Sequence, residues 1–593
     1  MSAERDAHTI VDTFDQALTS CSKLIEASDC SYSEQSINEL VNLLNSISDS
    51  LISAPEQENE DSENVAIEIL TRLHQHIALP SLKQEVIDAL AFELPKAVAR
   101  FACVSSRCLE LAENVVDRFV ERCSPRDMLS ILCEALGSTT ELFMVPGYFI
   151  PLLGGLIKVL VLIQRRHYEQ VKTAVPVILN ALETISSKSD DEDPEYEKLF
   201  HKAIGVANSI REVCLKLGAK DSEKLRALLS LYVLQIMVEN SCESDILALV
   251  SVGMTSDILR CLPVVLELSG FLQHCELSYI GLITGFEVNL VLKLVPGDDC
   301  DDGMLCFSRV KLGAAIGVIW GYKTSEVAEA AKADLTVVIK KLQGNWTRRW
   351  EAIGMLKYIF SCANLPWELK KHAIRFLLCI MDGIVSHSYN DHGDLSMHVS
   401  TLYTSLQAIE MVIMYASDSE LRRNAFSAFK KVLADIPTSI RFDVLRALIG
   451  NSDSSSMIGL LVDIVKEEML LERTERNNSS PNAVLNSDVI RYASFWNPPV
   501  LELMEVLSAL NLYRFILITE STGNSNHTGI LCKDKLQKAY NEWLLPLRTL
   551  VTGTIAQNQR GDYDTSDMIC ALNPVELVLY RCIELVEEKL KHL

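Results

Sequence analysis

Residues 399–432 read VSTLYTSLQAIEMVIMYASDSELRRNAFSAFKKV. This stretch carries two apolar stripes, one after the other. In each stripe the apolar residues recur every three or four positions, the spacing that places side chains on one face of an α-helix. The stretch therefore predicts two consecutive amphipathic helices. The first stripe comprises Val399, Leu402, Leu406, Ile409, Val412 and Ile413, and the second comprises Leu421, Ala425, Ala428, Phe429 and Val432.

The same spacing recurs from one end of the chain to the other. A single helix cannot bury its apolar face alone, whereas stacked helix pairs can bury it and leave a long outer surface free for binding. We therefore predict an all-α fold, a HEAT- or armadillo-like helical-repeat solenoid. At about 40–47 residues per repeat, 593 residues would hold roughly a dozen pairs, although no strict period is visible. A third predicted stripe comprises Val327, Ala331, Leu335, Val338, Ile339 and Leu342.

Charge and cysteine content limit the function classes. The formal net charge is −24, which repels phosphate, so nucleic-acid binding is not expected and a basic or mixed protein partner is favoured. The 17 cysteines form no CxxC pair, and many lie within apolar helical pattern, where they act as small hydrophobes. Met1–Ile10 is polar and charged and does not resemble a secretory signal. We expect a reducing compartment, the nucleus and/or the cytoplasm.

One segment, Met144–Ile163, is apolar enough to require a test against membrane insertion, because Lys158 is its only charge. Two prolines and three glycines interrupt its first half. A turn followed by a buried helix from about Pro151 is therefore the prediction, and no membrane association is expected.

The pattern divides the chain into four parts. Residues 1–297 are predicted as N-terminal helical repeats and residues 304–473 as central helical repeats. Residues 474–497, rich in Asn and Ser, are predicted as a polar linker. Residues 498–593 then form a C-terminal unit of helical repeats.

The usual local marks of chemistry are missing from the sequence. It has no P-loop, no GxSxG nucleophile elbow, no HExxH and no kinase signature. The acidic run Gly297–Gly303 departs from EF-hand spacing, and the histidines of Ser386–His398 fit no standard zinc site. We expect no enzyme activity, no cofactor and no metal. Catalytic residues that converge only in space would escape this search.

Two tryptophans four residues apart, Trp346 and Trp350, flank the pair Arg348 and Arg349. Both tryptophans share one helix face. The favoured interpretation is a pair of core anchors beside exposed arginines. The alternative is a contact patch for a protein partner, since Trp and Arg dominate interface hot spots.

The C-terminal unit holds the candidate partner-binding residues. Asn511 and Arg514 are expected along an apolar stripe that includes Leu503, Met504, Leu507 and Ile518. A buried polar group without a partner costs about 1–3 kcal/mol, so each needs a partner inside the fold or on another protein.

The last helix is predicted to begin with Asn573 as its cap and Pro574 in its first turn. Four residues are expected to point outward from it: Leu577, Tyr580, Arg581 and Glu584. An exposed Leu, Tyr and Arg on a terminal repeat is unusual for a solvated cap, although scattered surface apolar residues are common. Its predicted buried stripe comprises Val575, Val578, Leu579, Cys582, Val586 and Leu590.

The strings Leu507–Phe515 (LSALNLYRF), His527–Gly529 and Trp543–Leu547 (WLLPL) resemble the glomulin family, in particular its plant branch. The resemblance spans nearly the whole chain, including Tyr148–Arg166. It implies a HEAT-like fold and a non-catalytic inhibitor of SCF-type cullin-RING ubiquitin ligases. It also implies that the C-terminal repeats bind the RING-box subunit, with its cullin, and block recruitment of the ubiquitin-conjugating enzyme.

For a plant member, the resemblance implies altered turnover of repressors in hormone signalling, auxin included, and support of lateral root initiation. Of the candidate contacts, Arg514 lies in a matching string, whereas Leu577, Tyr580 and Arg581 follow from helix geometry alone. The chain is expected to be a monomer by itself. The alternative function is a helical-repeat scaffold of another class, a transport receptor or a phosphatase regulatory subunit, which would bind its partner along central repeats.

Overall fold

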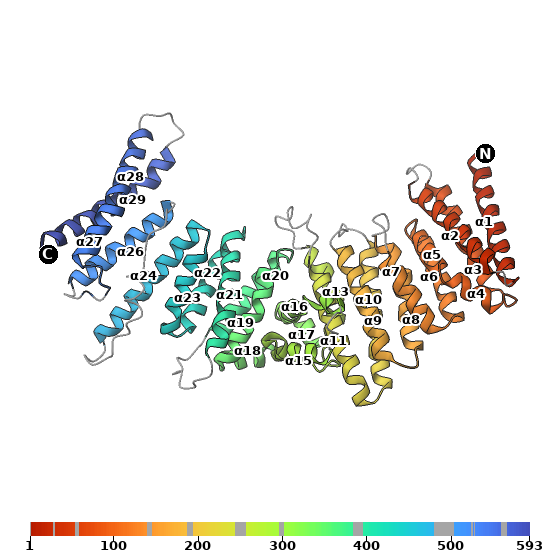
Figure 1. Ribbon diagram of the computed structural model, residues 1–593. Coiled ribbons are helices and arrows are strands. Elements are labelled where there is room, and N and C mark those ends of the chain that lie inside the picture. Colours follow the sequence, from red (N-terminus) through yellow and green to blue (C-terminus); the bar gives the residue numbers. More distant parts are fainter. Residues whose placement is uncertain are drawn as a thin grey trace. The chain divides into compact units, whose positions relative to one another are not determined.

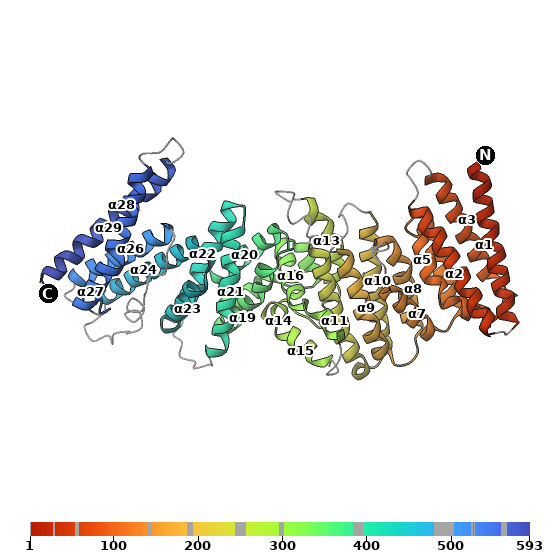
Figure 2. The same cartoon turned by 45° about the horizontal axis from the view of Figure 1, so that its top comes forward.

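The computed structural model describes residues 2–27, 30–53, 59–138, 145–186, 194–242, 256–295, 302–382, 395–478, 503–522, 526, 528–558 and 566–592. Every element among these residues is a helix (Figures 1 and 2). The chain divides into two compact units, Met1–Ser386 and His387–Leu593. The predicted all-α helical-repeat fold is confirmed.

Unit 1 begins with a regular succession of helices. They are α1 (Ser2–Glu26), α2 (Cys30–Ile52), α3 (Asn59–Ala78), α4 (Gln84–Ala91), α5 (Leu94–Phe101), α6 (Ser106–Arg122), α7 (Pro125–Gly137), α8 (Pro146–Leu162), α9 (His167–Ser186), α10 (Pro194–Lys216) and α11 (Ala219–Ser241).

Contacts between alternate helices make this part of unit 1 a two-layered stack. In one layer α3 packs on α6, α6 on α8 and α8 on α10. In the other layer α7 packs on α9 and α9 on α11. Each helix also contacts a neighbour in the opposite layer, as α7 contacts α8 and α10 contacts α11 (Figure 1). This arrangement buries one face of every helix, as a solenoid of helix pairs requires.

The second half of unit 1 has shorter helices. They are α13 (Ser256–Ser269), α14 (Tyr279–Thr284), α15 (Phe286–Leu294), the 3₁₀ helix η3 (Asp302–Phe307), α16 (Val310–Lys323), α17 (Ser325–Ala330), α18 (Leu335–Gln343), α19 (Trp346–Ser361) and α20 (Trp367–Met381). Helix α16 is buried on nearly all sides because α11, α17, α19 and α20 all pack on it.

Unit 2 contains α21 (Leu395–Tyr415), α22 (Ser419–Asp435), α23 (Thr438–Asn451), α24 (Ser455–Asn478), α26 (Leu503–Thr522), α27 (Lys533–Ala539), the π-helical turn η4 (Tyr540–Leu544), α28 (Leu545–Asn558) and α29 (Ser566–His592). The two helices predicted from residues 399–432 are α21 and α22. All five residues of the α22 stripe are buried, and in the α21 stripe only Val399 is half-exposed. Asp418 caps α22 by accepting a hydrogen bond from the Glu420 amide at 2.8 Å.

The stripe predicted over residues 327–342 belongs to two helices and not to one. Lys332 has a positive φ of 51°, a left-handed conformation that ends α17. Asp334 then caps α18 by accepting a hydrogen bond from the Thr336 amide at 2.9 Å. Val327 and Leu342 are nevertheless both fully buried, because α17 packs on α13 and α16 while α18 packs on α19 and α20.

The apolar segment at 144–163 forms α8, which starts at Pro146 and not near Pro151. Pro151 lies inside the helix, and the helix is buried against α6, α7 and α10. A proline at residue 146, in the first turn, has no amide that needs an intrahelical acceptor, so the helix can begin there. Among the described residues, no helix combines the length and the hydropathy needed to cross a membrane.

Of the two tryptophans predicted as core anchors, Trp350 is buried, with 1% of its surface exposed, whereas Trp346 is half-exposed. Their rings lie 4.9 Å apart between centroids. Arg349, which was predicted to be exposed, is instead buried, with only 2% of its surface exposed. Its Nη1 donates hydrogen bonds to the carbonyls of Leu342 at 3.3 Å and Gln343 at 3.0 Å. The guanidinium thus satisfies the carboxyl end of α18, which explains its burial.

The predicted linker at 474–497 is not where the chain divides into compact units. Helix α24 continues through residues 474–478, and the rest of the linker lies outside the described residues. Residues 297–301 of the predicted acidic run lie outside the described residues. So do residues 386–394 of the segment that contains three histidines.

Candidate partner-binding face on the last helix

Helix α29 spans Ser566–His592, so it starts earlier than the predicted cap at Asn573. Pro574 lies inside it and is exposed. The predicted buried face is correct for Val575, Val578, Leu579, Cys582 and Val586, whereas Leu590 is half-exposed. This face packs against α26, with further contacts from α28, α27 and η4.

The opposite face of α29 is exposed, as the sequence predicts. Leu577 has 74% of its surface exposed and Tyr580 has 40%. The Arg581 and Glu584 side chains are 47% and 61% exposed. These four residues follow one another at helical spacing and therefore form one continuous stripe, which we call the α29 face.

One ion pair crosses the α29 face. The Arg581 Nη1 lies 2.8 Å from the Glu584 Oε2, one turn along the helix. An exposed pair of this kind contributes little to stability, because water solvates both charges. Both charges are therefore available to a protein partner. The last turn of α29 adds Lys589, Lys591 and His592.

Helix α26 is turned differently from the predicted orientation. Its buried apolar residues are Val506, Ala509, Leu510, Leu512, Tyr513, Ile516 and Leu517, and Ser508 and Glu520 are buried as well. Of the predicted stripe, Leu507, Asn511 and Arg514 are half-exposed and Ile518 is 37% exposed, while the side chains of Leu503 and Met504 lie outside the described residues. The argument that Asn511 and Arg514 are buried and need a partner is therefore wrong.

The six candidate contact residues fall into two groups. Four lie on the α29 face. Asn511 and Arg514 lie on α26, which packs against the opposite, buried side of α29. Arg514 is close to Cys582 on that side. Burial raises the pKa of the Cys582 thiol to about 12, and the Arg514 guanidinium and backbone act in the opposite direction.

A buried aromatic contact supports this part of unit 2. The rings of Tyr513 on α26 and Trp543 in η4 meet edge to face at 5.3 Å between centroids. The Tyr540 hydroxyl donates a hydrogen bond to the Glu587 Oε1 at 2.6 Å, which ties η4 to α29. Leu550 on α28 is 66% exposed, and sequence reasoning missed it because the α28 pattern does not distinguish its faces.

Among the described residues, no group of three or more His, Cys, Asp or Glu side chains is arranged to hold a metal ion. The α29 face carries no nucleophile paired with a base. Its chemistry is that of a contact surface, with one aliphatic, one aromatic and two charged side chains in a row.

A family profile described as "Uncharacterised protein family, YAP/Alf4/glomulin" matches residues 20–207 and 377–582. The "Aberrant root formation protein 4" of Arabidopsis thaliana is 45% identical over 574 residues, which cover 94% of this chain and 89% of that protein. The chain therefore belongs to the YAP/Alf4/glomulin family, as the sequence strings indicated.

Two solved structures matched at low similarity. A circular tandem repeat protein is 12% identical, with a TM-score of 0.22 over 99% of this chain and 98% of that one. A structure of importin beta is 11% identical, with a TM-score of 0.21 over 92% of this chain and 68% of that one.

Proposed function

We propose that this protein is a non-catalytic inhibitor of SCF-type cullin-RING ubiquitin ligases. In this proposal the C-terminal unit binds the RING-box subunit and covers the surface that recruits the ubiquitin-conjugating enzyme. The family relationship supports the class of function. The observation that carries the choice of surface is the α29 face, where Leu577 and Tyr580 lie exposed beside Arg581 and Glu584.

The physical chemistry of masking fits this surface. Inhibition by competition requires only that two proteins cannot occupy one site at once, so no catalytic group is needed. Burial of an exposed Leu and Tyr at an interface removes apolar surface from water and so favours binding. Tyr and Arg are also enriched in interface hot spots. The net charge of −24 favours encounter with a partner that carries basic residues.

The first test is a pull-down of the RING-box subunit, in complex with its cullin, by the full-length chain. Leu577→Glu and Tyr580→Ala are expected to reduce binding at least tenfold, since a hot-spot residue contributes 2 kcal/mol or more. Arg514→Glu tests the second group of candidate residues. The matched control is Leu215→Glu on α10, because Leu215 is 71% exposed and lies in unit 1.

Each outcome of this test is informative. Binding that is lost with Leu577→Glu and kept with Leu215→Glu supports the α29 face. Binding that survives Leu577→Glu and Tyr580→Ala but not Arg514→Glu moves the site to α26. A folded wild-type chain that does not bind the RING-box subunit contradicts the proposed function and favours a scaffold of another class.

A second test measures ubiquitin transfer by the neddylated ligase. Saturating wild-type chain is expected to stop transfer, and added ubiquitin-conjugating enzyme should restore it by competition. Because the Arabidopsis relative is named for root formation, we further propose that this chain acts in lateral root development, in the nucleus and the cytoplasm. Expression of wild-type and Leu577→Glu chains in plants lacking the relative would test whether ligase binding is required there.

A further inference from the structure

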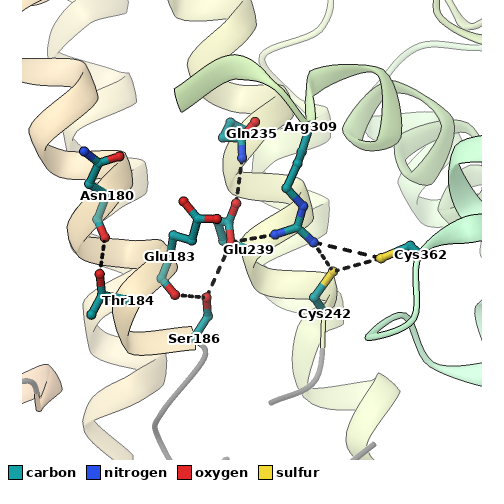
Figure 3. Close-up of polar contacts among 9 residues, drawn as sticks. All are labelled: Asn180, Glu183, Thr184, Ser186, Gln235, Glu239, Cys242, Arg309 and Cys362. Atoms are coloured by element: carbon teal, nitrogen blue, oxygen red, sulfur yellow. Dashed lines mark hydrogen bonds and ion pairs between the residues drawn. The ribbon is translucent and has the colours of Figure 1, made fainter. Parts of the chain in front are cut away.

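Two cysteines from distant parts of unit 1 meet beside a half-buried arginine, Arg309 (Figure 3). Cys242 follows the last residue of α11, and Cys362 follows the last residue of α19. Their Sγ atoms lie 4.0 Å apart, although 120 residues separate them in the chain. Both helices pack on α16, and this packing fixes the C-terminal ends of α11 and α19 relative to each other.

Arg309, just before α16, lies between this pair and a buried carboxylate. Its Nη2 donates a hydrogen bond to the Cys242 Sγ at 2.9 Å and lies 4.0 Å from the Cys362 Sγ. Its Nη1 lies 3.4 Å from the Glu239 Oε2. Figure 3 shows the guanidinium oriented toward both groups at once.

The carboxylate has its own supporting contacts. Glu239 is 1% exposed, and it accepts hydrogen bonds from the Gln235 Nε2 at 2.7 Å and the Ser186 Oγ at 3.4 Å. Burial raises the pKa of Glu239 even though Arg309 acts against this shift.

Two sulfurs this close, beside one guanidinium, can share a single proton between them. The contact with Cys242, together with Arg309 and the nearby Lys370 of α20, lowers the pKa of Cys362 despite burial. The same contact, together with burial and the Glu239 charge, raises the pKa of Cys242 well above its ordinary value. With Arg309 and the second sulfur both beside it, Cys362 is assigned as the nucleophile and Cys242 as the thiol that reacts with it afterwards.

We propose that Cys242 and Cys362 form a reversible disulfide when the protein meets hydrogen peroxide. The Cys362 thiolate attacks one peroxide oxygen, the O–O bond breaks, and the leaving hydroxide takes up a proton to become water. The sulfenic acid formed on Cys362 is then attacked by the Cys242 sulfur. The S–S bond forms, and the Cys242 proton leaves with the sulfenic hydroxyl as a second water. A cellular thiol reverses the modification by thiol–disulfide exchange.

The geometry suits this chemistry. A movement of about 2 Å brings sulfurs at 4.0 Å to the bonding distance of a disulfide. The bond would join α11 to α19 and close a long loop of chain. It would therefore lock the packing of both helices on α16.

The test uses the purified, reduced, full-length chain treated with hydrogen peroxide. Remaining thiols are alkylated, and peptides are mapped by mass spectrometry under non-reducing conditions. A peptide pair linking Cys242 to Cys362 is expected before the exposed Cys532 is oxidised. The thermal unfolding midpoint is expected to rise by several degrees on oxidation and to return on reduction.

Variants separate the two roles. In Cys242→Ser, a sulfenic acid should accumulate on Cys362 and be trapped by dimedone, whereas Cys362→Ser should leave Cys242 unmodified. Arg309→Gln should slow the oxidation of Cys362 about tenfold, because the thiolate loses its neighbouring positive charge. Both cysteine variants are conservative, and the wild-type peptide map needs no variant at all.

The proposal is overturned if Cys532 is fully oxidised while Cys242 and Cys362 are still recovered as thiols. It is also overturned if each of the two is found bonded to a different cysteine. Neither result depends on whether the chain binds a ubiquitin ligase, so the two proposals stand or fall separately.

Discussion

Gly313 on α16 lies against the backbone of Leu234 on α11. A Cβ at position 313 would come well within 3.0 Å of the Leu234 carbonyl oxygen and carbon, a distance that real Cβ atoms essentially never reach. The absence of a side chain is what allows the two helices to approach this closely. The glycine-containing run at 313–317 is therefore a packing feature, as its position in an apolar stretch indicates.

Gly313→Ala is expected to destabilise unit 1 by about 3 kcal/mol, because backbone atoms cannot move aside as a flexible side chain can. Gly317→Ala is the matched control on the same helix. A Cβ there would meet the Met237 side chain at 3.1 Å, which can shift, so a loss of about 1 kcal/mol or less is expected. Urea unfolding followed by tryptophan fluorescence measures both, and equal losses would contradict the backbone contact.

Glu410 on α21 provides a prediction about pH. It is 7% exposed, its Oε1 has no hydrogen-bond partner among the described residues, and burial raises its pKa to about 7. In the unfolded chain the pKa has its ordinary value of 4.5. Between these two values the folded state holds a proton that the unfolded state has lost. Stability therefore falls as the pH rises from 4.5 to 7, by roughly 3 kcal/mol in total.

Glu410→Gln removes this titration. Relative to wild type, the variant is expected to gain about 2–3 kcal/mol of unfolding free energy at pH 8 and much less at pH 5. Urea unfolding at the two pH values measures the difference. Glu588→Gln, at an exposed position on α29, is the control and should change stability by less than about 0.5 kcal/mol at either pH. A gain for Glu410→Gln that is the same at both pH values would exclude a titrating buried carboxyl.

The existence of the helices follows from the sequence more reliably than their orientation. The α22 stripe is correct because one side of that helix is apolar and the other is charged. Helix α26 packs between α24 and α29, so apolar residues occur around its whole circumference. Periodicity alone could not decide between a face through Leu507 and Ile518 and the buried face through Ala509 and Tyr513.

Long-range pairs were beyond sequence reasoning for a different reason. Cys242 and Cys362 lie at helix ends, outside any apolar stripe, and 120 residues apart. No local motif signals such a pair, because its geometry depends on how α11 and α19 pack on α16. The outward direction of Leu577 and Tyr580 was predictable, since α29 has one clear buried face. Whether they bind a partner depends on a second protein.

Tyr513 offers a test of an unsatisfied buried group. Its ring packs on Trp543, but its hydroxyl has no hydrogen-bond partner among the described residues, and burial raises its pKa. Tyr513→Phe keeps the ring contact and removes the unpaired hydroxyl, so stability is expected to stay the same or rise by about 1 kcal/mol. Tyr513→Ala should cost about 3–5 kcal/mol, because it removes the ring as well. A large loss in the Phe variant, measured by urea unfolding, would indicate that the hydroxyl has a partner.

One buried carboxylate near the end of α26, Glu520, binds Thr528. The Glu520 Oε1 accepts a hydrogen bond from the Thr528 amide at 2.7 Å, and its Oε2 accepts one from the Thr528 hydroxyl at 2.6 Å. Both residues are nearly fully buried, with 6% and 5% of their surfaces exposed. The Thr528 hydroxyl also accepts a hydrogen bond from the Ile530 amide at 3.2 Å.

Thr528→Val keeps the shape of the side chain and the backbone contact but leaves one carboxylate oxygen and one amide without partners. A loss of about 2–3 kcal/mol is expected, since hydrogen bonds to charged groups are the stronger ones. Thr549→Val on α28 is the control, because its exposed hydroxyl bonds only to the Leu545 carbonyl of its own helix. Urea unfolding should separate the two variants by more than 1 kcal/mol. If the two variants lose the same free energy of unfolding, water replaces the Thr528 hydroxyl at Glu520 without cost. The Glu520 carboxylate then does not hold Thr528 in place.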